Sequence, residues 1–173
     1  MLLPLAVAVG IYLFRAHHTP RYNNALFGEH GNAAVELKAQ LSTALLGLAL
    51  IQLGLALWMY GAVPGARSAP RPVRRGHRAL GFLAFLFSLP IAHHCLTTYG
   101  IETTSPRAAI HSFAGCAPLR CIRGQGDCRA QRASARLAAP TVGTLLVLGV
   151  ALLWYTAALW ALNGDSVPGF SSV

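Results

Sequence analysis

The chain has 173 residues, of which 54% are hydrophobic and 11% are charged, and its formal net charge is +9. Soluble domains carry about 25% charged residues, and the apolar residues here are clustered in runs, so the composition excludes an ordinary soluble domain. A positive charge of this size suggests nucleic acid when it lies on a soluble surface. Here the arginines lie in loops between apolar runs, so we expect no nucleic acid partner.

The first apolar run, residues 2–14, is followed at once by Arg15. A signal peptide would start with positive charge and end at a small-residue cleavage site, and neither feature is clear. We therefore predict a short first transmembrane helix, whose length a start further upstream would explain. A signal anchor is the alternative.

Three longer runs, residues 40–61, 79–98 and 141–162, have the length of about 20 residues that a membrane-spanning helix needs. Gln52 lies in the middle of the first of these runs, and we expect it to face another helix where its amide finds a partner. Aromatic rings favour the membrane interface, and those near the ends of these runs are Trp58, Tyr60, Trp154, Tyr155 and Trp160.

The loop 62–78 sets the predicted orientation because it is rich in arginine and contains Arg67, Arg71, Arg74, Arg75 and Arg78. The positive-inside rule places such a loop in the cytoplasm. The N-terminus is then cytoplasmic, whereas residues 15–38 and 99–107 lie outside.

The fourth predicted span is incomplete. Residues 108–118 give about 16 Å of helix, which is half a bilayer, and an arginine-rich segment, residues 119–139, follows. A one-nucleotide shift of plausible codons for 119–139 yields an apolar helix with a basic end. We therefore suggest a compensated pair of frameshifts, which resequencing tests; a genuine arginine-rich loop is the alternative.

The four cysteines are Cys95, Cys116, Cys121 and Cys128, and none of them forms a CxxC pair. This spacing excludes a zinc ribbon. We expect these thiols to be unpaired and structurally minor.

Seven histidines accompany only five acidic residues, which is unusual for apolar spans. His94 ends the third span and His111 begins the fourth, and the loop between them is short. We expect the two helices to be antiparallel neighbours whose imidazoles meet near the outer face. Two neutral imidazoles from facing helices would suit the iron of a b-type haem.

Glycines and a proline accompany these histidines. Gly115 follows His111 by four residues, and Gly81 follows His77 by the same spacing, so each could give a porphyrin clearance on its helix face. Pro90, one turn before His93 and His94, can bend its helix. His77 has no evident histidine partner on the inner side, so a second haem is not supported.

Two other interpretations of the histidines stay open. Interfacial histidines could simply hydrogen-bond to backbone, headgroups or water. The outer cluster could instead hold Zn or Cu, because imidazole suits both ions. No carboxylate or methionine pattern supports that metal site, so it ranks below haem.

Three blocks of sequence, HRALGFLAF, SLPIAHHC and HSFAGC, resemble a family of small uncharacterised bacterial multi-span proteins. The resemblance covers roughly residues 35–117 and 140–162 and ends near Cys116 or Ala117. That family is more remotely similar to transmembrane b-type cytochromes and ferric-reductase-like carriers. The similarity implies haem held by His94 and His111, with His77 matching the other family histidine; the HC step favours His94 over His93.

Together these features predict an all-α integral membrane bundle of about five helices, one membrane domain over residues 1–173, in a bacterial plasma membrane. The predicted function is that of a haem b electron-transfer subunit with a redox partner at the outer face. Nothing in the sequence binds a nicotinamide or flavin, so we do not expect a complete enzyme. A cofactor-free membrane scaffold and outer-face Zn or Cu handling are the alternatives.

Overall fold

The computed structural model describes residues 19, 21, 23–65, 69–124 and 135–170. The described chain is helical, with α2 (Gly31–Met59), α3 (Arg71–Thr98), α4 (Pro106–Gly124) and α5 (Ala135–Leu153). α5 continues directly into a π-helical segment, η2 (Trp154–Leu159), and a final turn, α6 (Trp160–Leu162). The predicted first span, residues 2–14, lies outside the described residues.

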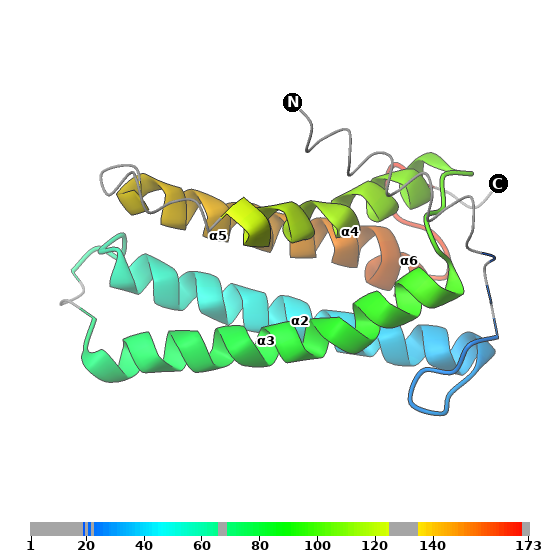
Figure 1. The fold of residues 1–173 in the computed structure, drawn as a ribbon, viewed down its shortest axis with the longest axis horizontal. Helices are drawn as coiled ribbons and strands as arrows, with labels where there is room; N and C mark the ends of the chain where they lie inside the picture. The colour runs from blue at the N-terminus through cyan, green and yellow to red at the C-terminus, as the bar shows by residue number, and fades with distance from the viewer. Residues whose placement is uncertain (1–18, 20, 22, 66–68, 125–134, 171–173) are drawn as a thin grey trace.

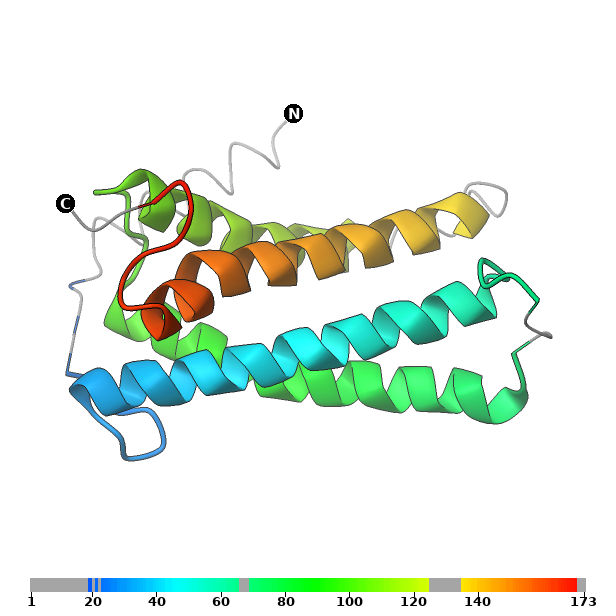
Figure 2. The same cartoon turned by 180° about the vertical axis from the view of Figure 1, so that it is seen from behind.

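The helices form two antiparallel pairs (Figures 1 and 2). α2 packs against α3, α4 packs against α5 and η2, and α2 joins the pairs through its contacts with α5 and η2. We call the end of the bundle where α2 begins, α3 ends, α4 begins and α6 ends the Thr98 end. The opposite end, where α3 begins, is the Arg71 end.

The distribution of side chains is that of a membrane protein. Large apolar residues such as Phe82, Phe113 and Leu145 are about 60% exposed, whereas the buried residues of the helices are mostly small, as in Ala39 and Ala158. Small residues at helix contacts and large apolar residues outside are expected when lipid is the solvent. Within the part of the chain that the structure describes, three helices are long and apolar enough to cross a membrane, over Gly31–Met59, Arg71–Thr98 and Thr141–Leu162.

These three helices contain the predicted runs 40–61, 79–98 and 141–162, apart from the last two residues of the first run, and they confirm an all-helical membrane-type fold. The predicted total of five spans is not supported, because α4 is not among the three. α4 nevertheless continues to Gly124, six residues beyond the predicted stop at residue 118. Its 19 residues correspond to about 28 Å.

Residues 125–134, the centre of the suspected frameshift, lie outside the described part, so the frameshift stays a prediction. The polar segment 119–139 otherwise contributes the end of α4 and the start of α5. Pro90 lies within α3, and both ribbon views show the C-terminal part of α3 bending toward the other pair (Figures 1 and 2). A proline lacks the amide donor of one helical hydrogen bond, which explains a bend at this place.

Candidate functional site

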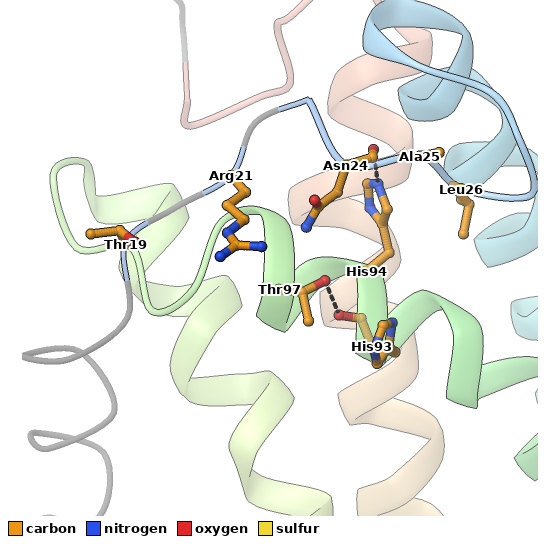
Figure 3. A pocket seen from close by; sticks show the side chains of 8 residues that line it. All are labelled: Thr19, Arg21, Asn24, Ala25, Leu26, His93, His94 and Thr97. Carbon is orange, nitrogen blue, oxygen red and sulfur yellow. Dashed lines mark hydrogen bonds between the residues drawn. The ribbon is translucent and has the colours of Figure 1, made fainter.

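His94 is a buried polar residue on α3, with 3% of its side chain exposed. Its Nε2 lies 3.2 Å from the carbonyl oxygen of Asn24, in the segment that crosses the end of α3 (Figure 3). A carbonyl only accepts, so Nε2 carries the hydrogen and Nδ1 carries the lone pair. Nδ1 is buried and has no hydrogen-bond partner among the described residues.

The surroundings of His94 hold the Thr98 end together. The His94 ring makes an edge contact with Tyr99 at 6.2 Å between ring centroids. The ammonium group of Lys38, from α2, lies over the Tyr99 ring, 4.2 Å from its centroid. The amide of Arg21 donates to the Thr98 carbonyl at 3.1 Å. His94 is therefore part of a packed junction between α2, α3 and the segment before α2.

His93 lies in a different environment from His94. Its side chain is exposed, and Figure 3 shows its ring directed away from the Asn24 carbonyl. The His93 carbonyl accepts a hydrogen bond of 2.9 Å from the Thr97 hydroxyl. The structure thus separates the two adjacent histidines into one buried ring and one exposed ring.

His111 projects from α4 toward the π-helical segment. Its Nδ1 lies 3.1 Å from the hydroxyl oxygen of Thr156. That hydroxyl has one hydrogen, and it donates this hydrogen to the Leu152 carbonyl at 2.8 Å. The Thr156 oxygen must then accept from His111, so Nδ1 carries the ring hydrogen and Nε2 carries the lone pair.

Thr156 connects α4 to η2 through a second contact. Its side chain is fully buried, and its carbonyl accepts a 2.6 Å hydrogen bond from Nη1 of Arg107. The guanidinium carbon of Arg107 also lies 3.7 Å from the centroid of the Trp160 ring.

Thr156 and Arg107 are two residues of this site that no sequence pattern predicted. A π-helical turn widens the backbone and is frequent at functional sites, but its hydrogen-bond register leaves no pattern in the sequence. The signal that could have found Thr156 is a threonine within the run WYTAAL, which is otherwise aromatic and aliphatic. Arg107, next to Pro106 at the start of α4, was counted only as part of a loop.

The expected neighbour relationship between α3 and α4 was wrong. α4 packs against α5 and η2, and the described parts of α3 and α4 do not pack extensively against each other. The short connection permits antiparallel contact, but both Arg107 and His111 bind Thr156. These polar contacts hold α4 against α5 and η2, so His94 and His111 belong to different helix pairs.

The predicted partner for Gln52 is confirmed. Its Nε2 donates to the His77 carbonyl at 2.7 Å, which joins α2 to α3. A Cβ at Gly81 would lie 2.7 Å from the same Nε2 atom. Gly81 therefore gives clearance to the Gln52 amide in this structure. His77 Nδ1 and Gln52 Oε1 are buried without hydrogen-bond partners among the described residues.

The second predicted clearance residue, Gly115, faces α5. A Cβ at Gly115 would lie 3.8 Å from Leu153 Cδ2, an ordinary van der Waals distance. Among the described residues, no group of three or more histidine, cysteine or acidic side chains lies close enough to hold a metal ion. Cys95 is a free thiol, and the side chains of Cys116, Cys121 and Cys128 lie outside the described part.

The fold and these contacts define the class as a small helical protein of membrane type, with polar junctions at the Thr98 end. A family model described as a family of unknown function, DUF6529, matches residues 1–169, and the chain belongs to that family. This agrees with the resemblance to an uncharacterised family. Comparisons with the curated proteins and with the solved structures give no match.

Proposed function

We propose that the protein is a membrane electron-transfer subunit that holds haem b through histidine, with His111 as the principal ligand. The observation that carries the proposal is the hydrogen bond between His111 and Thr156. Metal-ligating histidines commonly donate the other ring hydrogen to a protein oxygen, which fixes the tautomer and the ring orientation. His111 has this arrangement, with its Nε2 lone pair left for a metal.

His94 is the proposed second ligand. Its Nδ1 is a buried imidazole nitrogen with a lone pair and no partner among the described residues, which is costly unless a ligand uses it. His77, on the same helix, also has a buried unpartnered Nδ1 and is the reserve candidate, while exposed His93 ranks below both. The donor chemistry of these imidazoles fits a haem iron.

Bound haem b would supply one-electron transfer at the iron. The chain itself would contribute the ring orientation at His111, through Thr156, and at His94, through the Asn24 carbonyl. The exposed apolar side chains of the helices support contact of the bundle with lipid. The orientation proposed from the arginines puts the Thr98 end outside, where a redox partner would dock, in a bacterial plasma membrane. The Arg71 end, with Arg74 and Arg75, would face the cytoplasm.

In this proposal the chain crosses the membrane about five times, with α4 as a fourth span and residues 2–14 as the first. α4 supports this count by its length of 19 residues. The third span begins at the arginine-rich end of α3, which agrees with the positive-inside rule.

A cofactor-free membrane scaffold is the second candidate. It is favoured by the separation of His94 and His111 into different helix pairs, and by the bond from His94 to Asn24. In that case His94 is a structural clamp for the segment before α2. Outer-face Zn or Cu handling ranks third, because the described residues hold no three-ligand cluster.

An absorption spectrum separates these functions. We expect the full-length protein, purified in detergent from haem-supplied cells, to show a Soret band and α and β bands on reduction. A folded, colourless protein without stoichiometric Zn or Cu by elemental analysis would reject both metal proposals and favour the scaffold. Stoichiometric Zn or Cu without haem would favour metal handling.

A further inference from the structure

We propose a phosphate-binding site at the Thr98 end, in the cavity between the segment before α2 and the last turns of α3. The cavity has a volume of about 500 Å³ and is lined by Thr19, Arg21, Asn24, Ala25, Leu26, His93, His94 and Thr97. A volume in this range is typical of small-molecule sites. It exceeds what a single ion needs.

The chemistry of the lining favours an anion. The lining includes the guanidinium of Arg21, the amide of Asn24, the hydroxyl of Thr19 and the exposed ring of His93, all hydrogen-bond donors. No carboxylate is among the described residues that line it. Arginine has the planar fork of donors that matches a phosphate. Figure 3 shows Arg21 directed toward the end of α3 that carries Thr97.

The frame of the cavity consists of hydrogen bonds to backbone atoms and does not depend on the side chain of Arg21. The backbone amide of Arg21 donates to the Thr98 carbonyl, and the backbone amide of Asn24 donates to the Arg21 carbonyl at 3.0 Å. The Asn24 carbonyl in turn accepts a hydrogen bond from the His94 ring. Leu26 is buried next to this turn, with 5% exposed. The Arg21 side chain is exposed, and none of the hydrogen bonds of this frame uses its guanidinium.

The location favours a phosphate group at the membrane surface. α3 is one of the three helices suited to span a membrane, and the cavity lies at its final turns. Lipid phosphates lie at the level where such a helix ends, and an arginine there can pair with a headgroup phosphate through its planar fork of donors. A phospholipid headgroup and a soluble phosphate share the chemistry that Arg21 would recognise, and binding measurements separate them.

The test uses the full-length protein in detergent, titrated separately with short-chain phosphatidylglycerol below its micelle concentration and with inorganic phosphate. Native mass spectrometry and isothermal titration calorimetry measure the bound ligand. We expect one saturable site and a roughly tenfold loss of affinity in Arg21→Gln, because the variant loses the charged donor that pairs with the phosphate. Arg71→Gln, at the opposite end, carries the same charge change and should alter affinity less than twofold.

The variant Asn24→Ala provides a second route to the same result, because it retains the backbone carbonyl that binds His94 and removes only the side-chain amide. Binding of phosphatidylglycerol alone identifies a headgroup site, and binding of inorganic phosphate identifies a soluble anion site. The proposal is overturned when neither ligand saturates the wild type, or when Arg21→Gln and Asn24→Ala both bind as tightly as Arg71→Gln does.

Discussion

Thr156 fixes the proton position of His111. The hydroxyl oxygen of Thr156 lies 3.1 Å from Nδ1 of His111 while its own hydrogen goes to the Leu152 carbonyl. These two residues are 45 positions apart in the chain and come from different helices. The pair therefore joins α4 to η2 and leaves Nε2 of His111 as the basic nitrogen.

The first prediction concerns this pair. Thr156→Val keeps the side-chain shape but leaves the half-buried His111 donor without its hydroxyl acceptor. We expect haem occupancy to fall about tenfold or more, because partners of metal ligands typically change metal affinity 10–100-fold. Thr156→Ser restores the hydroxyl and should recover occupancy. The measurement is the haem-to-protein ratio of the purified variants, together with the low-spin g values of the oxidised protein. Equal ratios in the Val and Ser variants would contradict this role of Thr156.

The second prediction separates the candidate ligands. His94→Ala combined with His111→Ala should abolish the Soret band, because both lone-pair nitrogens are lost. The His77→Ala variant should keep the Soret band, because it retains both proposed ligands, His94 and His111. Each variant is compared as a membrane preparation of matched protein content, which avoids losses in purification. A pigmented double variant would show that neither histidine is needed to hold the haem.

The third prediction tests Arg107 as the anchor of α4 and does not depend on any cofactor. Arg107→Gln removes the cation–π contact with Trp160 and the hydrogen bond to the Thr156 carbonyl. We expect destabilisation of about 2–4 kcal/mol, because the variant loses a cation–π contact and one charged hydrogen bond. Thermal unfolding in detergent measures it. Arg74→Gln, an exposed arginine in the first turn of α3, is the matched control and should unfold like the wild type.

Several of these relationships follow from the sequence, and others do not. The long apolar runs predict the helices because about 20 apolar residues are needed to cross a bilayer. The sequence predicted that Gln52 would find a hydrogen-bond partner on another helix, because an amide in the middle of a span needs such a partner. The packing of α4 was not predicted, because it depends on Thr156 and Arg107, which are distant in the chain. The Asn24–His94 bond spans 70 residues, and no local pattern indicates such a contact.

The fourth prediction tests the contact between α2 and α3 at Gly81. Gly81→Ala places a Cβ 2.7 Å from Gln52 Nε2, so the amide must move and lose its bond to the His77 carbonyl. We expect a loss of about 1 kcal/mol in the free energy of unfolding. Gly54→Ala is the control, because its Cβ meets nothing within 4 Å and alanine favours helix. In the background of Gln52→Ala, the Gly81→Ala change should become neutral, since the clash is gone. Thermal unfolding of the wild type, the two single variants and the double variant measures the coupling. A Gly81→Ala cost that persists without Gln52 would place the close contact elsewhere.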